Sequence, residues 1–197
     1  MFIVIDGPDG SGKTTLSKKL VEEWKLNGVQ SIYTFEPTYD SLPGIEIRSL
    51  MGIRKIEDIY AFADLFVDDR KEHLNSIIIP ALARGENVVC DRYKYSALAY
   101  QQLQGVDAEY LVDINKGCLV PDFIFILIPK CVDVILQRIL NRAKEREIFE
   151  EREFLTQTLE LYKKLPSYFP NENIIFLDAE TTIEKNIEKI NCIISND

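Results

Sequence analysis

The chain has 197 residues, 46% of them hydrophobic and 28% charged, a composition typical of globular proteins and unlike disordered or collagen-like chains. Its 23 basic and 32 acidic residues give a formal net charge of −9, which disfavours proteins whose main partner is a nucleic-acid backbone. The four cysteines show no zinc-type spacing and the longest apolar run, 123–128, is far short of a membrane span. We therefore expect a cytoplasmic protein with reduced thiols, no signal peptide, and neither nucleic acid nor membrane as a partner.

Short apolar runs that alternate with segments of helical period predict five buried strands. In chain order these are Phe2–Ile5, Ile32–Phe35, Val88–Cys90, Phe123–Ile128 and Ile174–Leu177. Strands this continuously apolar are typical of a parallel sheet covered on both faces. The pattern predicts an α/β fold with three layers, a five-stranded parallel sheet flanked by helices, in a single domain spanning residues 1–197.

The predicted helices fill the intervals between the strands. The first follows the first strand and ends at Gly28. Segment 56–84 predicts one long helix or two abutting helices with a break at Pro80. Segment 138–152 is dense in charges of both signs, and 154–165 resumes a helical pattern.

A glycine-rich loop separates the first strand from the first helix. Its sequence, Gly7-Pro8-Asp9-Gly10-Ser11-Gly12-Lys13-Thr14, matches G-x-x-x-x-G-K-[ST] without a mismatch. Backbone N–H groups in such a loop surround the β-phosphate of a nucleoside triphosphate, and the helix N-terminus adds partial positive charge. We expect Lys13 to reach the β- and γ-phosphates and Thr14 to place its hydroxyl on Mg²⁺. The loop therefore predicts a P-loop NTPase fold, but it does not indicate which reaction uses the triphosphate.

The residues around the loop favour a kinase over other triphosphate-binding classes. A guanine-reading switch needs N-K-x-D, and the segment Asn115-Lys116-Gly117-Cys118 lacks the final Asp. The third strand ends in Asp91-Arg92, an acid followed by a base, which suits two charged substrates better than a motor. Because ligands bind at the carboxyl edge of a parallel sheet, Asp91 is expected to hold a Mg²⁺-bound water. Arg92 is expected to bridge donor and acceptor phosphates, and Arg48 to grip the acceptor phosphate.

A phosphate acceptor would need no strong general base, because its second pKa is about 6 and it is mostly ionised at neutral pH. The only histidine, His73, is then free to be a structural residue. With no second metal ligand near it in the sequence, we expect His73 on the helix surface or partly buried.

Several short motifs, in their order along the chain, are similar to those of thymidylate kinases. They are Gly7–Thr15, Phe35–Thr38, Ile47–Leu50, Leu65–Arg70, Asp91–Tyr93, Ser96 and Ala99–Gln101. The similarity runs from the first strand to the Asp178-Ala179 loop. It implies transfer of the γ-phosphoryl group of Mg-ATP to dTMP, giving dTDP, by a homodimer with a lid at about 138–152.

The resemblance, together with the loop chemistry, assigns residues to each site. Catalysis is assigned to Asp9, Lys13, Arg92, Arg142 and Arg146, with one of the last two favoured as the lid arginine that meets the transferred group. ATP binding is assigned to Gly7, Pro8, Asp9, Gly10, Ser11, Gly12, Lys13, Thr14, Thr15 and Arg138. Binding of dTMP is assigned to Asp9, Glu36, Tyr39, Arg48, Phe66, Arg70, Arg92, Ser96, Tyr100 and Gln101, and Mg²⁺ binding to Thr14 and Asp91.

The resemblance also implies how the nucleotide is recognised. Phe66 matches the aromatic on which thymine stacks, although its spacing from Phe62 fits plain core packing as well. Arg70 matches the donor to the O4 carbonyl, which would exclude cytosine because cytosine carries an amino group there. Ser96 and Gln101 match positions near the N3 edge. The Tyr100 equivalent leaves no space for a 2′-hydroxyl, and adenine should lie between the lid helix and the Asp178-Ala179 loop.

The sequence departs from the family pattern in two places, and one of its motifs is shared with another family. Phe35 precedes Glu36 where many members have Arg. Thr38-Tyr39-Asp40 replaces the usual glycine pair, so Tyr39 is expected to hold part of the acceptor. Glu36-Pro37 also resembles deoxynucleoside kinases, in which the glutamate is the base for a 5′-hydroxyl. A protein that uses ATP to change partners, without any kinase activity, is the alternative from another class.

Overall fold

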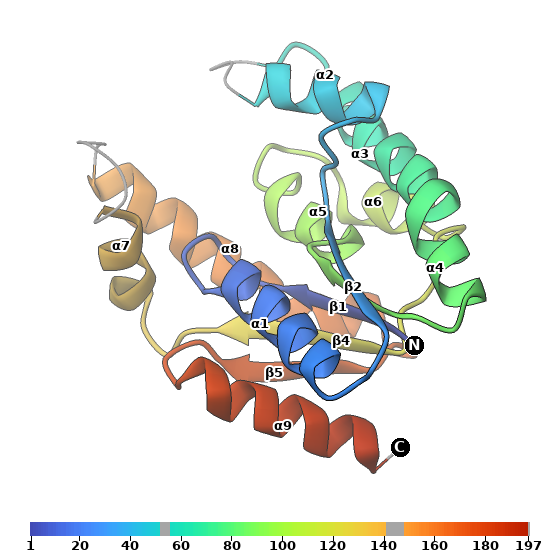
Figure 1. Cartoon of the computed structure of the whole chain (residues 1–197). Coiled ribbons are helices and arrows are strands. Elements are labelled where there is room, and N and C mark those ends of the chain that lie inside the picture. Colours follow the sequence, from blue (N-terminus) through green and yellow to red (C-terminus); the bar gives the residue numbers. More distant parts are fainter. Residues whose placement is uncertain (52–55, 141–147, 197) are drawn as a thin grey trace.

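The computed structural model describes residues 1–51, 56–140 and 148–196 (Figure 1). Its centre is a five-stranded parallel sheet in the order β2-β3-β1-β4-β5. The strands are β1 (Phe2–Asp6), β2 (Ser31–Phe35), β3 (Asn87–Asp91), β4 (Phe123–Ile128) and β5 (Ile174–Asp178). All five predicted strands and the α/β class are confirmed.

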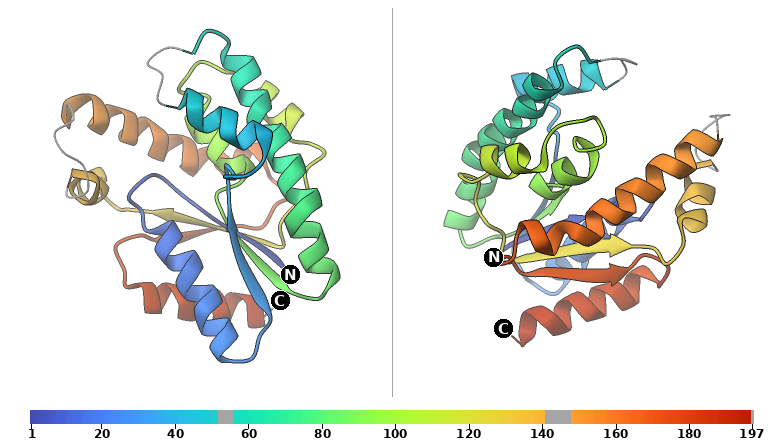
Figure 2. Two further views of the ribbon diagram at one scale, coloured as in Figure 1. Left: turned by 45° about the horizontal axis from the view of Figure 1, so that its top comes forward. Right: turned by 180° about the vertical axis from the view of Figure 1, so that it is seen from behind.

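Helices cover both faces of the sheet. They are α1 (Lys13–Leu26), α2 (Leu42–Leu50), α3 (Ile59–His73), α4 (Ile79–Ala83), α5 (Lys94–Tyr100), α6 (Ala108–Ile114), α7 (Val132–Leu140), α8 (Ile148–Tyr168) and α9 (Ile183–Ser195). The right-hand view of Figure 2 shows α8 and α9 on opposite faces of the sheet. Helix α1 packs beside α9, and α3, α5 and α6 lie on the α8 side. The three predicted layers are therefore present.

Side chains along β1 alternate between two cores, and this alternation holds the layers together. Phe2 and Val4 face the core that α5 and α8 complete, whereas Ile3 and Ile5 face the core formed with α1 and α9. All four are buried. Burying one such side chain contributes about 2 kcal/mol, so a strand that is apolar on both sides stabilises the sheet from above and below.

The predicted 56–84 segment is two helices joined by a π-helical turn. Helix α3 continues into the π-helical segment Leu74–Ile78, and α4 follows. Pro80 lies in the first turn of α4, directly after the π-helical segment. Because proline has no N–H to donate to the preceding turn, it interrupts the regular helical hydrogen bonding there. The break thus falls just before the proline, as the sequence predicts.

The sheet order brings the carboxyl ends of β1 and β3 side by side, with Ile5 paired to Asp91. The loop that follows β1 and the residues that follow β3 therefore share one edge of the sheet. No helix in the described ranges is both long and apolar enough to cross a bilayer.

Candidate active site

The glycine-rich loop joins β1 to α1 in a conformation that requires glycine. Gly7, Gly10 and Gly12 have φ values of 145°, 80° and 100°. A Cβ atom on Gly7 would lie 2.6 Å from the carbonyl oxygen of Leu127, so a side chain there would also clash with β4. The loop consequently lies flat against the sheet edge and leads into the N-terminus of α1.

The buried carboxylate of Asp6 organises the start of this loop. Its Oδ1 accepts hydrogen bonds from Gly7 N–H (2.7 Å), Ser96 Oγ (2.7 Å) and Tyr162 Oη (2.8 Å), and its Oδ2 accepts from Tyr93 N–H (3.3 Å). Sequence reasoning missed Asp6. The available signal was an ionisable residue that ends an otherwise apolar strand immediately before the loop.

Two cations converge on Asp9 inside the loop. Lys13 Nζ lies 3.3 Å from both Pro8 O and Asp9 Oδ1, and Arg92 Nη2 donates to the same Asp9 oxygen. Burial acts to raise the pKa of Asp9, but the charges of Arg92 and Lys13 outweigh it and lower that pKa. Burial and the neighbouring Arg92 lower the pKa of Lys13, against the attraction of Asp9. This concentration of positive charge suits a polyanionic ligand.

Arg92 lies between the loop and a cavity that it lines together with Asp9. Its φ of 72° lies in the left-handed region, which costs about 1–3 kcal/mol for a non-glycine residue and is typical of functional sites. Its Nη1 donates to Ser96 Oγ at 3.0 Å, and its guanidinium lies 5.3 Å from the centre of the Tyr100 ring. Tyr100 Oη in turn accepts from Asp9 N–H at 3.1 Å. The guanidinium is thus held between Asp9, Ser96 and Tyr100.

Thr14 and Asp91, predicted together as a metal site, lie together. Thr14 Oγ1 donates to Asp91 Oδ2 at 2.5 Å. Asp91 Oδ1 is buried and accepts no hydrogen bond from the residues that the structure describes. Burial raises the pKa of Asp91, while Lys13 and Thr14 act to lower it. A hydroxyl and a carboxylate with an unpartnered oxygen fit the hard oxygen ligands that Mg²⁺ prefers.

Asp91→Asn is expected to stabilise the ligand-free protein at neutral pH. Because the folded-state pKa of Asp91 lies above its unfolded value, the native state binds more protons between the two values, and stability falls as the pH rises through that window. The variant should exceed wild type by about 1 kcal/mol in free energy of unfolding at neutral pH. Urea denaturation should show this gain shrinking below the ordinary aspartate pKa. A gain that grows toward acid, or equals that of the exposed control Asp113→Asn, would contradict the assignment.

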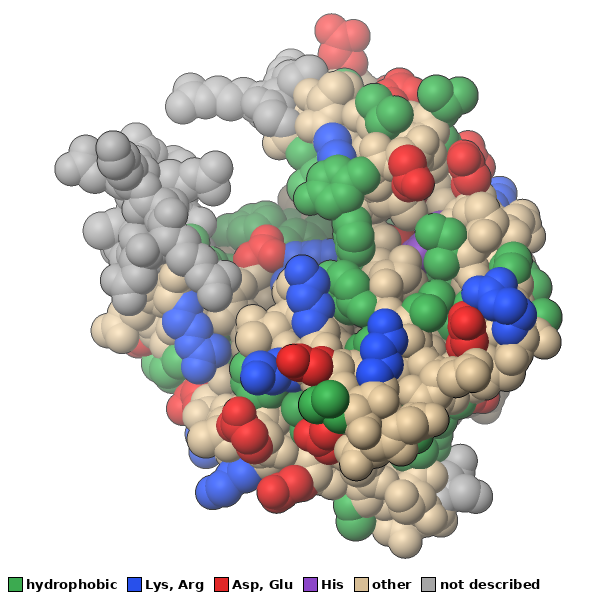
Figure 3. All heavy atoms as spheres, in the orientation of Figure 1, with side chains coloured by type: hydrophobic (Ala, Val, Ile, Leu, Met, Phe, Trp, Pro, Cys, Tyr) green, Lys and Arg blue, Asp and Glu red, His purple; other side chains and the backbone are tan. Residues whose placement is uncertain are grey.

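A cavity of about 290 Å³ opens beside the loop. Figure 3 shows the surface hollowed between the segments that carry α2 and α7. Eight of the residues predicted to bind the acceptor line the cavity: Asp9, Glu36, Phe66, Arg70, Arg92, Ser96, Tyr100 and Gln101. The structure therefore gathers in one place residues that are up to 92 positions apart (101 − 9).

The cavity walls include an aromatic ring on which a base could stack and a buried polar atom without a hydrogen-bond partner among the described residues. Phe66 is half-buried, and its ring lies edge-to-face with that of the buried Phe62 at 5.2 Å. Both rings line the cavity, the buried Phe62 together with the half-buried Phe66. Gln101 Oε1 is buried without a hydrogen-bond partner among the described residues. Such an oxygen is ready to accept a hydrogen bond from a ligand.

Arg48 and Tyr39 are not brought into the cavity. Arg48 donates to the carbonyl oxygens of Pro37 and Thr38, and its guanidinium lies 3.6 Å from the centre of the Tyr39 ring. Tyr39 is 66% exposed, and neither side chain lines the cavity. Their predicted contacts with the acceptor phosphate stay predictions.

A second, smaller pocket of about 190 Å³ lies behind the loop. Gly10, Ala179 and Arg138 line it together with residues of α1 and α9. Arg138 donates to the carbonyl oxygens of Gly10 (3.4 Å), Ser11 (3.3 Å) and Ala179 (3.1 Å). This is the place expected for adenine. Arg142 and Arg146 lie outside the described residues.

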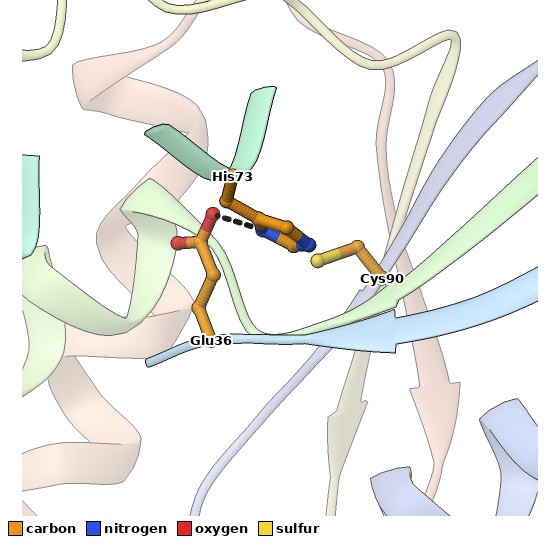
Figure 4. Close-up of side chains that lie close together, drawn as sticks. All are labelled: Glu36, His73 and Cys90. Carbon is orange, nitrogen blue, oxygen red and sulfur yellow. Dashed lines mark hydrogen bonds and ion pairs between the residues drawn. The ribbon is translucent and has the colours of Figure 1, made fainter. Parts of the chain in front are cut away.

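Sequence reasoning missed a buried network behind the cavity. Arg70 Nε and Nη2 each lie 2.8 Å from Glu36 Oε2, and His73 Nδ1 lies 3.2 Å from Glu36 Oε1 (Figure 4). His73 is 1% exposed, so its expected position at the surface or partly buried was wrong. The reason is long-range: the π-helical turn after α3 and the end of β2 enclose it. Both oxygens of Glu36 are engaged, which disfavours a free base for a 5′-hydroxyl.

Comparison with known proteins gives a consistent picture. A model of the thymidylate kinase family matches residues 5–190. A probable thymidylate kinase of Methanocaldococcus jannaschii is 37% identical over 190 residues, covering 96% of this chain and 91% of that protein. One of Thermococcus kodakarensis is 36% identical over 211 aligned positions, covering all of both chains. A thymidylate kinase of Brachyspira hyodysenteriae is 35% identical over 179 residues, covering 90% of this chain and 85% of that protein.

Proposed function

The chain belongs to the thymidylate kinase family and transfers a phosphoryl group from ATP to dTMP, giving dTDP, and from this premise we propose how its residues divide the work. ATP lies with its phosphates in the glycine-rich loop and its adenine in the pocket beside Arg138. The acceptor dTMP lies in the cavity lined by Phe66 and Arg70, with its phosphate toward Arg92. The observation that carries this arrangement is the contact of Arg92 and Lys13 with the same Asp9 oxygen, because it joins the loop to the cavity.

Catalysis in this proposal is positioning and charge neutralisation. Lys13 and Arg92 bring fixed positive charge to the equatorial oxygens of the transferred group, where negative charge is spread in the transition state. Bound Mg²⁺ would supply further neutralisation of the donor phosphates, and Thr14 and Asp91 are the residues that would hold it. Arg142 or Arg146, from a lid at about 138–152, would complete the set and exclude water.

The base of dTMP is recognised in the inner part of the cavity. Phe66 offers the stacking face, and Arg70 retains N–H groups beyond those given to Glu36 and Asn115, which can donate to O4. Gln101 Oε1 can accept from the N3–H of thymine. Tyr100, held against Arg92, limits the space beside the sugar.

Phe66→Ala is expected to weaken dTMP binding by about 10- to 100-fold, since stacking of a base on an aromatic ring contributes about 1–3 kcal/mol. Isothermal titration with dTMP measures this directly, and the affinity for Mg-ATP should stay unchanged. Phe176→Ala, which removes a 39% exposed phenylalanine on β5, is the matched control and should bind dTMP normally. Equal affinity of both variants would remove Phe66 from the site and, with it, this placement of the base.

We treat residues 1–197 as a single kinase domain that acts as a homodimer, as the family resemblance implies, and sedimentation equilibrium tests the second point. A cytoplasmic location is supported by four free cysteines, two of them buried. Because Arg70 and His73 bind both carboxylate oxygens of Glu36, the deoxynucleoside kinase alternative, in which Glu36 acts as a base, is disfavoured.

A further inference from the structure

The network behind the cavity extends from Arg70 to β2. Thr34 Oγ1 lies 2.5 Å from His73 Nε2, and His73 Nδ1 lies 3.2 Å from Glu36 Oε1. Glu36 Oε2 binds Arg70, whose Nη1 also donates to Asn115 Oδ1 at 2.5 Å. All five side chains are buried, so each polar atom depends on the others for its partners.

Figure 4 shows Glu36, His73 and Cys90 close together, with potential metal-ligand atoms within 4.8 Å of one another. Their bonds argue against a cation. Both imidazole nitrogens of His73 are engaged, and the Cys90 thiol donates to Arg92 O at 3.1 Å. The Arg70 guanidinium already neutralises Glu36. The cluster is therefore a hydrogen-bonded chain.

The chain has a definite direction. An imidazole with its proton on Nδ1 donates to Glu36 and accepts from the Thr34 hydroxyl at Nε2, which satisfies all three groups. In this arrangement His73 fixes one oxygen of Glu36, and the other oxygen fixes the fork of Arg70. Arg70 lines the cavity, but His73 does not.

We infer that His73 is a positioning residue for base selection: by holding Glu36 Oε1 it orients the Glu36–Arg70 pair so that Arg70 N–H groups face the base. This inference rests on the proposed placement of dTMP. An Arg70 that can tilt would lose its donation to O4 of thymine and its clash with the amino group of cytosine. Selection between dTMP and dCMP should therefore depend on a side chain that touches neither nucleotide.

Two amide substitutions of His73 test the hydrogen bonds of its two ring nitrogens separately. Asn at position 73 can place its N–H near the position of Nδ1 and keep the bond to Glu36, whereas Gln reaches the Nε2 position and keeps the bond to Thr34. His73→Leu removes both bonds. The measurement is kcat/KM for dTMP and for dCMP in each full-length variant, with the KM for ATP and the thermal midpoint recorded alongside.

We expect His73→Leu and His73→Gln to lose about tenfold in the dTMP to dCMP ratio, mainly through the KM for dTMP, with the KM for ATP unchanged. His73→Asn, which keeps the bond to Glu36 and loses only that to Thr34, should lose no more than about twofold to fivefold. A merely structural role would lower the thermal midpoint of all three variants and change both acceptors in parallel, which would overturn the inference. An Asn variant no better than the Gln variant would do the same.

Thr34→Val keeps the test open if the histidine variants do not fold. It removes the hydroxyl that donates to His73 Nε2 and leaves every cavity residue in place. Because one of the two hydrogen bonds that hold His73 is lost, we expect a twofold to fivefold loss in the dTMP to dCMP ratio of kcat/KM. An unchanged ratio would overturn the inference. If wild type itself does not phosphorylate dTMP, the proposed placement of dTMP fails, whereas normal wild-type turnover with equal selectivity in all variants removes only the role of His73.

Discussion

Replacing Lys13 by methionine is expected to lower kcat for phosphoryl transfer by about 1000-fold, since removal of one preorganised charge from a transition state commonly costs 100- to 1000-fold. Methionine keeps the length and apolar stem of lysine but not its charge. Lys13 is buried and lies 3.3 Å from Asp9, and no other lysine of α1 lies at the loop. The loss should appear in kcat, because the charge is needed most when the phosphoryl group is in flight.

Steady-state kinetics with coupled detection of ADP measures this loss. Lys13 does not line the acceptor cavity, so dTMP affinity from isothermal titration should change by less than about threefold. Lys19→Met, at an exposed position of the same helix, is the matched control and should keep full activity. A Lys13 variant with more than a tenth of wild-type kcat would show that the loop lysine does not act on the transferred group.

Arg92→Lys is expected to lower kcat/KM for dTMP by about 100-fold although the charge is retained. Arginine offers a planar fork that binds Asp9 and Ser96 at once and lies over the Tyr100 ring, and an ammonium group cannot do all three. The positive φ of 72° is equally unfavourable for both residues, so backbone strain does not distinguish the variant from wild type.

Both kcat and the KM for dTMP should change in Arg92→Lys, because Arg92 lines the acceptor cavity and also contacts the loop residue Asp9. The KM for dTMP should rise and kcat should fall, while the KM for ATP moves little. Arg84→Lys, at an exposed ion pair with Glu86, is the control for the same chemical change. Wild-type kinetics in Arg92→Lys would mean that charge alone suffices and that the fork geometry has no role.

The parts of the fold that follow from local patterns could be predicted from the sequence. Continuous apolar runs predict the strands because a strand buried on both faces has no polar side. The glycines of the loop indicate where the backbone adopts positive φ values. The edge on which Asp91 and Thr14 meet follows from the parallel sheet alone.

Contacts between distant segments could not be predicted in the same way. His73 lies 37 residues from Glu36, and they meet only because the end of α3 comes to lie beside the end of β2, where Thr34 also bonds His73. Arg48 has a position typical of an anion ligand, yet its guanidinium binds the carbonyl oxygens of the segment after β2. Asp6 directly follows the predicted strand Phe2–Ile5, and its four hydrogen bonds come from three separate segments, which the local sequence does not reveal.

The most direct test of the central claim is ADP release from Mg-ATP by the purified protein with dTMP, dUMP, dCMP, dAMP, UMP and thymidine as acceptors. The account predicts strong turnover with dTMP, weaker turnover with dUMP, and very little with dCMP, dAMP, UMP or thymidine. In the proposed arrangement Arg70 would face the base edge, Tyr100 would crowd the sugar, and Arg92 would need an acceptor phosphate. Turnover with thymidine alone would make Glu36 a base and the protein a nucleoside kinase. ADP release that no acceptor increases would contradict the kinase account altogether.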